Sequence, residues 1–320
     1  MPAVEAVSDV AAGDLGELSI GAVVRLAVGA DVGRMVAHDP IARLGHDVEG
    51  VHQARVATRR LRSHLATFAP VLRPAPVQRL SKELRWLGRA LGLARDLDVL
   101  ADRIARTVDS FEPLTKEDGL VLLGVMAVDR AAAAQALAGV LASRRYRELL
   151  GELARTVAGP PFLRSAGLPA EEFLAGAVAS RLADLAAAIG ALSATPMDAQ
   201  LHQVRIIAKP ARYVAELSGP VLGEDCARLA RRLADLSDAL GLLHDGARAN
   251  EWLDEVGADP LRAIAVVRIR AVEIDRMNEA RDAWPRRWER VRAAAAAMGM
   301  SGGPEPRAGA LDGRISSLRS

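Results

Sequence analysis

The chain is poor in cysteine and in aromatic residues. Its only cysteine, Cys226, has no partner for a disulfide and no companion thiol for a metal site, which favours a small core residue in a reducing cytoplasm. Aromatic residues make up 3% of the sequence, too few for strands, which prefer aromatic and β-branched residues. Long stretches rich in Ala, Leu and Arg, all good helix formers, therefore predict an all-α protein.

An uncharged apolar run of about 18 residues, the length of a transmembrane helix, is also absent. Residues 1–20 hold four acidic residues before the first basic one, the reverse of a secretory signal peptide. We therefore expect a soluble, cytoplasmic protein that does not bind membranes.

Two distant segments share a pattern of histidine and cations. Residues 51–72 read VHQARVATRRLRSHLATFAPVL and residues 201–222 read LHQVRIIAKPARYVAELSGPVL. Packing alone requires only a shared apolar pattern, so the repeated His-x-x-Arg-x-x-x-(Arg/Lys)-x-x-Arg indicates a site. Spacings of three and four place these side chains on one helix face, with the apolar face opposite. The two cationic rows are His52, Arg55, Arg59 and Arg62, then His202, Arg205, Lys209 and Arg212; the expected core face of the first is Ala54, Thr58, Leu61, Leu65 and Phe68.

Positive charge is concentrated around the first row. Residues 52–95 contain ten Arg or Lys and a single acid, Glu83, a net charge of 10 − 1 = +9, whereas the whole chain carries +2. Segregated charge of this kind projects a field that collects polyanions. The alternative is that carboxylates from neighbouring helices neutralise the rows.

A second repeat supports an internal duplication. LGLARDLDVL at residues 91–100 aligns with LGLLHDGARA at residues 240–249, in nearly the same register as the first repeat. Two tandem helical bundles related by pseudo-twofold repetition explain this agreement, and such an arrangement could bring the two cationic rows across a central groove. Asp96, Asp98 and Asp245 are expected to hold Arg side chains by ion pairs or to cap helices.

Helical periodicity and the positions of Gly and Pro divide the chain further. We expect an irregular N-terminus at 1–14, a first bundle at 15–155, a linker at 156–170, a second bundle at 171–296 and a disordered tail at 297–320. The expected helices cover about 16–37, 48–69, 77–107, 114–142 and a short stretch to 155, then about 171–191, 197–218, 222–255 and 260–296, the helix near 197 being capped by Thr195.

The repeated segments resemble the CHAD family, the conserved histidine α-helical domain. The matching text is DVEGVHQARVATRRLRSHL with LGRALGLARDLDVL in the first half, and LHQVRIIAKPARY with LSDALGLLHD in the second. The resemblance covers roughly residues 15–295. It implies an all-α fold of two tandem four-helix bundles with a basic central groove, and a non-catalytic activity, the binding of inorganic polyphosphate, with some members located on polyphosphate granules.

Carried over by position, the resemblance implies a polyphosphate-binding site and no metal or other cofactor. Its residues are His52, Arg55, Arg59, Arg60 and Arg62, with Lys82, Arg85, Arg89 and Arg95 on the adjacent helix, and His202, Arg205, Lys209, Arg212 and Tyr213 in the second half. His244, Arg231 and Arg232 would extend the groove.

Two features depart from the family's pattern. Pro210 lies inside the second row, where it removes a backbone hydrogen bond and predicts a kink that affects Arg212 and Tyr213. The Glu-x-Glu-x-Lys signature of the CYTH-type triphosphate tunnel domain, which often accompanies the family, does not occur. The chain is therefore interpreted as the binding module alone, with a CYTH-type triphosphatase or another protein of polyphosphate metabolism as its partner.

Two other functions compete with polyphosphate binding. A metal-dependent phosphohydrolase would need a P-loop, clustered carboxylates or a nucleophile with a base, and the sequence shows none of these. A nucleic-acid-binding protein would use the same cations, yet only Phe68, Trp86 and Tyr213 are near enough to stack on bases. His52 and His202 either donate to phosphate, orient a neighbouring Arg or serve a structural role.

Overall fold

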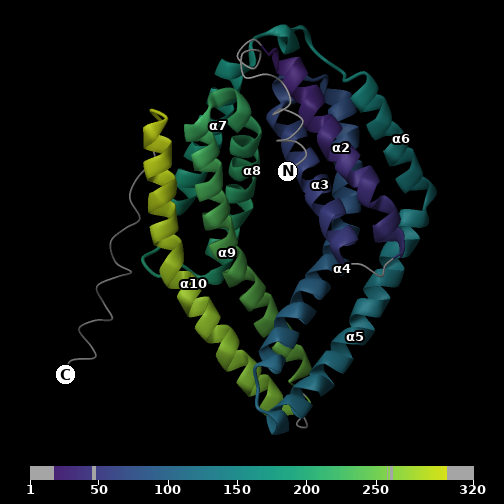
Figure 1. Ribbon diagram of the computed structural model, residues 1–320, viewed down its shortest axis with the longest axis vertical. Coiled ribbons are helices and arrows are strands. Elements are labelled where there is room, and N and C mark those ends of the chain that lie inside the picture. Colours follow the sequence, from purple (N-terminus) through teal and green to yellow (C-terminus); the bar gives the residue numbers. More distant parts are fainter. Residues whose placement is uncertain (1–17, 45–47, 258, 260–261, 301–320) are drawn as a thin grey trace, which may run out of the picture. The chain divides into compact units, whose positions relative to one another are not determined.

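The computed structural model describes residues 18–44, 48–257, 259 and 262–300 (Figure 1). Within these residues the protein is all-helical, with nine α-helices and no strand, as the composition predicts. The predicted irregular N-terminus and most of the predicted disordered tail lie outside the described residues.

The helices follow the predicted order closely. The first five are α2 (Ile20–Leu44), α3 (Val48–Thr67), α4 (Pro74–Asp109), α5 (Pro113–Ala142) and α6 (Arg144–Ala158). The last four are α7 (Ala170–Gly190), α8 (Asp198–Leu222), α9 (Glu224–Val256) and α10 (Ala263–Ala297).

Three predicted boundaries are wrong. α2 continues through Pro40 to Leu44, and α8 continues through Pro220 to Leu222. The N-cap of α8 is Met197 rather than Thr195, because the backbone N–H of Met197 is satisfied by the Gln200 side chain at 2.9 Å. Neither proline ends its helix.

Residue contacts divide the chain into two compact units. Unit 1 comprises residues 1–171 and 252–270, and unit 2 comprises residues 172–251 and 271–320. The end of α9 and the start of α10 thus belong to unit 1.

In unit 1, α3 packs between α2 and α4, and α5 packs against α4 and α6 (Figure 1). The predicted apolar face of α3 forms the contact: Thr58, Leu61 and Phe68 are fully buried, and Ala54 and Leu65 nearly so. Burying this face leaves the opposite face of α3, which carries the cationic row, toward solvent.

Backbone hydrogen bonds hold part of the segment 156–170, which is predicted to be a linker. The N–H of Leu163 donates to the carbonyl of Val71 at 2.9 Å, and the N–H of Arg73 donates to Pro161 at 2.8 Å. A short 3-10 turn, Arg164–Gly167, follows. These bonds tie the segment before α7 to the turn between α3 and α4.

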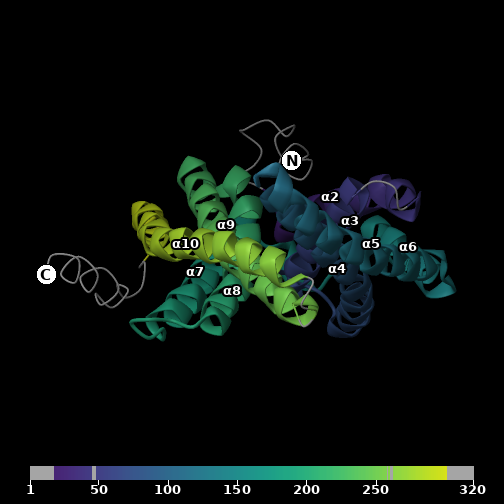
Figure 2. The same cartoon turned by 90° about the horizontal axis from the view of Figure 1, so that it is seen from below.

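In unit 2, α7, α8, α9 and α10 share one core, and two views show α7, α8 and α9 side by side (Figures 1 and 2). Trp284 and Trp288 of α10 pack in this core with leucines of α9. Cys226 is buried there, and burial raises the pKa of its thiol to about 12. The prediction of a small core residue at Cys226 is confirmed.

Two helices are long and apolar enough to cross a membrane by length and composition alone: Lys116–Ala142 within α5, and α7. Isolated charges interrupt the α5 segment, which explains why a search for uncharged runs misses it. One or two such helices are weak evidence for a membrane span.

Candidate functional site

The first cationic row lies on the face of α3 opposite the buried one. His52, Arg55, Arg59 and Arg62 are all half-buried. Their hydrocarbon stems therefore cover the helix, while their charged ends reach its surface.

A second row of cations runs along α4 beside them. Lys82, Arg85 and Arg89 are exposed, and their spacing of three and four puts them on one face. Gly88 and Gly92 of the same helix face side chains of α3. A Cβ atom at Gly88 would lie 3.9 Å from Nη1 of Arg62, and one at Gly92 would collide with the guanidinium of Arg55. The two glycines therefore leave room for the α3 arginines against α4.

Cations crowd one another in this region. Burial lowers the pKa of Arg62, and the nearby Arg85, Arg59 and Arg89 lower it further. No ion pair among the described residues involves any member of a set that we call the unit 1 cationic cluster: Arg59, Arg62, Lys82, Arg85 and Arg89.

Glu83, the single acid within residues 52–95, bonds to an arginine outside the cluster. Glu83 accepts two hydrogen bonds from Arg145 of α6, at 2.6 and 3.1 Å, and these bonds lower the pKa of its carboxyl group. The guanidinium of Arg145 also lies over the ring of Trp86, 4.2 Å from its centroid. Glu83 is therefore bonded toward α6, which leaves the cluster with a net positive charge.

The predicted aspartates hold arginines, as the sequence suggests. Nη2 of Arg55 donates to Asp96 at 3.0 Å, and Arg130 pairs with Asp98 at 2.8 Å. In unit 2 the corresponding pair is Arg205 with Asp245, at 3.9 Å. Gly241, the counterpart of Gly92, lies beside Arg205, since a Cβ there would be 3.8 Å from Nε. Both repeats thus place the first arginine of the row beside an aspartate and a glycine of the following helix, with closer contacts in unit 1.

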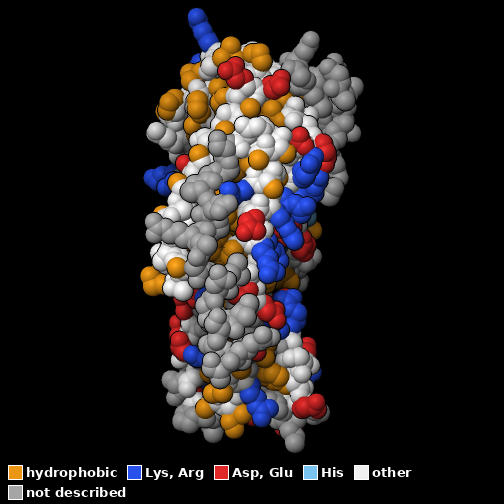
Figure 3. Space-filling view, turned by 90° about the vertical axis from the view of Figure 1, so that its left-hand side faces the viewer, with side chains coloured by type: hydrophobic (Ala, Val, Ile, Leu, Met, Phe, Trp, Pro, Cys, Tyr) orange, Lys and Arg blue, Asp and Glu red, His pale blue; other side chains and the backbone are white. Residues whose placement is uncertain are grey.

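Three other predicted cations of unit 2, Arg212, Arg231 and Arg232, pair with acids. Arg212 bonds Glu216 at 2.6 Å and lies 3.8 Å from Asp238 of α9. Arg231 and Arg232, expected to extend the groove, pair with Glu224 and Asp235 at 2.5 and 3.3 Å. A face with basic and acidic side chains interspersed is drawn in Figure 3.

Pro210, which is predicted to kink this helix, does not end it. α8 remains one helix from Asp198 to Leu222, so Arg212 and Tyr213 keep helical positions after Pro210. Both side chains are half-buried. In unit 1 the position of Pro210 is held by Arg60, which lies about 100° around the helix from Arg59 and thus beside the row rather than in it.

Both histidines of the repeats have cations beside them. Burial lowers the pKa of His52, and Arg95 lowers it further, while Glu49 acts in the opposite direction. Burial, Arg205 and Lys209 lower the pKa of His202. Both imidazoles are therefore uncharged at neutral pH, where each can donate only one hydrogen bond.

Unit 2 adds a second imidazole, that of His244, which is expected from the sequence to extend the groove. The ring of His244 stacks on that of His202, with centroids 4.2 Å apart and planes at 29°. Arg248, four residues further along α9, also acts on His244. The alignment of His244 with Arg95 signals this position, whereas no sequence signal indicates Arg248.

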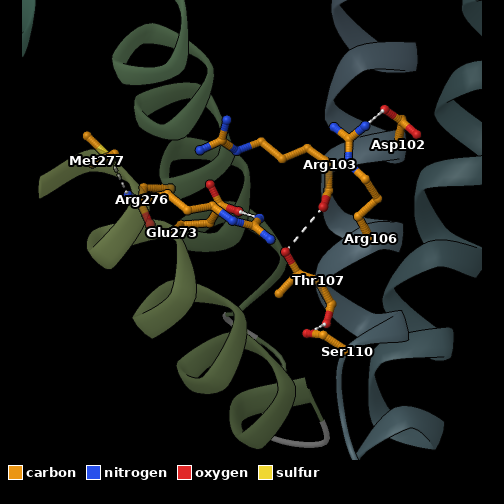
Figure 4. Close-up of polar contacts among 9 residues, drawn as sticks. Asp102, Arg103, Arg106, Thr107, Ser110, Glu273, Arg276 and Met277 are labelled. Atoms are coloured by element: carbon orange, nitrogen blue, oxygen red, sulfur yellow. Dashed lines mark hydrogen bonds and ion pairs between the residues drawn. The ribbon is translucent and has the colours of Figure 1, made fainter. Parts of the chain in front are cut away.

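Two other buried charged groups, Asp31 and Glu273, have a side chain of opposite charge type beside them. Nδ1 of His64 lies 2.8 Å from the fully buried Asp31. Glu273, also fully buried, accepts a hydrogen bond from Arg276 at 2.8 Å (Figure 4). Among the described residues no group of three His, Cys, Asp or Glu side chains could hold a metal ion.

Comparison with known proteins places these features in a family. Residues 26–254 match the family model of the CHAD domain. A segment of 65 residues is 40% identical to the Uncharacterized protein MT2285 of Mycobacterium tuberculosis (strain CDC 1551 / Oshkosh). That segment is 20% of this chain, and the match spans only 13% of the relative.

Two solved structures share the fold. PptA from Streptomyces chartreusis superposes with a TM-score of 0.70 at 19% identity, covering 85% of this chain and all of that one. The CHAD domain from the plant Ricinus communis superposes with a TM-score of 0.68 at 24% identity, covering 91% of this chain and 95% of that one. With the family model matching most of its length, this chain belongs to the CHAD family.

Proposed function

We propose that this protein binds inorganic polyphosphate without catalysing its conversion. The observation that carries the proposal is the unit 1 cationic cluster, five cations without an ion pair among the described residues. Crowded like charges destabilise a protein unless an anion lies opposite them. Membership of the CHAD family supports the choice of a phosphate polymer as that anion.

Polyphosphate suits this surface chemically. It carries about one negative charge per phosphate along a flexible chain, so it can follow two parallel rows of cations. Arginine grips phosphate oxygens in pairs and keeps its charge at any physiological pH. His52 and His202 would donate single hydrogen bonds beside these arginines.

The same positions would act in unit 2 through His202, Arg205, Lys209, Arg212 and Tyr213. The shared Arg–Asp and Arg–Gly contacts of the two units support an internal repeat. The pseudo-twofold relation of two tandem four-helix bundles and the basic central groove stay predictions.

The cellular setting follows from the ligand. We expect a cytoplasmic protein that associates with polyphosphate granules and works beside a CYTH-type triphosphatase or another protein of polyphosphate metabolism. Nucleic acid would be the weaker ligand, because few aromatic side chains lie near the cationic rows to stack on bases.

Binding of labelled long-chain polyphosphate at two salt concentrations tests the proposal. Between about 50 and 200 mM salt, affinity should fall by more than about tenfold, because each phosphate contact releases counterions. Charge reversal by Arg59→Glu with Arg89→Glu should abolish most binding. The matched control is Arg147→Glu with Arg155→Glu, which reverses two exposed charges of α6 outside the rows and should bind nearly as the wild type.

Three outcomes would overturn the proposal. Equal losses in both double variants would show that only net charge matters. Preferred binding of RNA or DNA in competition at physiological salt would indicate a nucleic-acid-binding protein. Release of orthophosphate from polyphosphate with a divalent metal, lost on changing Arg55 and Arg205, would indicate an enzyme.

A further inference from the structure

Two imidazole rings lie face to face between α8 and α9. His202 belongs to the repeated cationic row, and His244 stacks on it at a centroid distance of 4.2 Å. Nδ1 of His202 is buried and has no hydrogen-bond partner among the described residues. Buried ring nitrogens normally have a partner, so this atom points to a group that binds here.

Cations surround the pair. Arg205 and Lys209 of α8 and Arg248 of α9 face His244, whose pKa burial and these charges lower to about 3. Asp245, next along α9, lies 3.9 Å from Arg205. In the free protein the pair is therefore uncharged at neutral pH, although it lies among permanent positive charges.

Unit 1 has a different residue at the position equivalent to His244. In the aligned segments Arg95 stands where unit 2 has His244. The charge of Arg95 lowers the pKa of His52, whereas the ring of His244 stacks on His202. Arginine carries its charge at every physiological pH, whereas histidine carries one only after taking a proton from solution.

We infer that the His202–His244 pair is a binding element of unit 2 that takes up a proton as polyphosphate binds, whereas Arg95 supplies a permanent charge at the equivalent place in unit 1. The inference rests on the proposed function. Phosphate oxygens would offset the surrounding cations and accept a hydrogen bond from the imidazolium, both of which favour its charged form. The second ring, stacked on the first, stabilises the charge through its π face.

Linkage gives the sign of the effect. The bound state holds more protons than the free state, so the affinity of unit 2 rises as the pH falls from 8 to 6. Uptake of one full proton would change the affinity about tenfold per pH unit, and partial uptake correspondingly less. Unit 1 contributes affinity that depends less on pH.

Reciprocal substitutions test the inference on the full chain. Calorimetric titration with long-chain polyphosphate at about pH 6.5, in two buffers of different protonation enthalpy, gives the number of protons taken up per polyphosphate bound. We expect fewer protons in His244→Arg, which imitates unit 1, and more in Arg95→His, which imitates unit 2. His244→Phe keeps an aromatic ring against His202 but cannot be charged, so it should take up fewer protons and bind more weakly at pH 6.

The comparison between variants is the readout, because polyphosphate has end groups that titrate in the same range. Equal proton uptake by the wild type, His244→Arg and His244→Phe would overturn the inference while the proposed function stands. Absence of polyphosphate binding by the wild type would overturn the proposed function and the inference with it. Circular dichroism of each variant separates a lost site from a lost fold.

Discussion

Arg62 of unit 1 and Arg212 of unit 2 occupy the same position of the repeated helix, yet their surroundings are opposite. Arg62 is crowded by Arg59, Arg85 and Arg89, whereas Arg212 bonds Glu216 at 2.6 Å and has a second acid nearby. The shared pattern therefore places the same cation at the surface twice. The neighbouring residues decide whether its charge is available to a ligand.

The cores of the two units differ in a similar way. His64 of α3 is buried against Asp31 of α2 at 2.8 Å, while the equivalent position of α8 is Val214, which is fully buried in an apolar core. Unit 1 thus places a polar pair inside and unpaired cations outside, and unit 2 has neither at the equivalent positions. The repeat therefore fixes the cationic row but not the residues around it.

Removing one partner of the buried Asp31–His64 pair should cause the largest loss of stability. Asp31→Ala leaves His64 buried without its partner, which should lower the free energy of unfolding by about 3–5 kcal/mol. Urea unfolding measures the loss, and hydrogen exchange of peptides from α2 and α3 locates it in unit 1. Asp102→Ala, which removes the partner of Arg106 from an exposed pair, should cost less than about 0.5 kcal/mol.

A double replacement tests whether apolar side chains can take the place of the Asp31–His64 pair. Asp31→Leu with His64→Leu replaces the pair by apolar side chains, as unit 2 does at Val214, and should restore most of the lost stability. If the double variant is as unstable as Asp31→Ala, the pair has a role that apolar packing cannot replace, and the comparison with unit 2 fails.

The next prediction concerns Arg62 and Arg212, the two equivalent arginines, and their effect on polyphosphate affinity. Arg62→Ala should weaken binding about tenfold, or about 1.4 kcal/mol, because its charge is not neutralised within the protein. Arg212→Ala should weaken binding less than about threefold, since Glu216 and Asp238 already offset its charge. Only Arg62→Ala should reduce the slope of log affinity against log salt, by roughly 0.7 to 0.9. Equal losses in the two variants would show that ligand binding breaks the Arg212 pairs at no net cost.

Much of the fold follows from local sequence signals. The nine helices in the described part of the chain lie close to their predicted positions, because Ala, Leu and Arg stretches separated by Gly and Pro are strong signals. Boundaries at Pro40 and Pro220 were not predictable, because a proline in the last turns of a helix removes a single hydrogen bond that neighbouring packing outweighs.

The cationic row can be predicted from the sequence, but the partners of its charges on other helices cannot. Spacing identifies the row from His52 to Arg62 and the aspartates that hold it, since these are regular or repeated. The partners on other helices are not visible: Glu83 of α4 bonds Arg145 of α6, which lies 62 residues away in the chain, and Asp238 of α9 lies 3.8 Å from Arg212 of α8. Such pairings depend on how helices pack, which residue spacing within one helix does not encode.

The smallest effect concerns the repeated glycines. Alanine in a helix is favoured over glycine by about 0.5–1 kcal/mol. Gly241→Ala has space, since its Cβ would lie 3.8 Å from Nε of Arg205, so it should raise the free energy of unfolding by about that amount. Gly92→Ala would displace the Arg55 guanidinium and break its bond to Asp96, which offsets the gain.

Binding separates the two variants further. Displacing Arg55 removes a guanidinium that Asp96 holds in position, so Gly92→Ala should weaken polyphosphate binding a few-fold, whereas Gly241→Ala should leave it unchanged. Thermal unfolding and the binding titration are measured on the same samples. A Gly92→Ala variant that gains stability and keeps full affinity would contradict this view, because Arg55 would then work equally well without the space that glycine provides against α4.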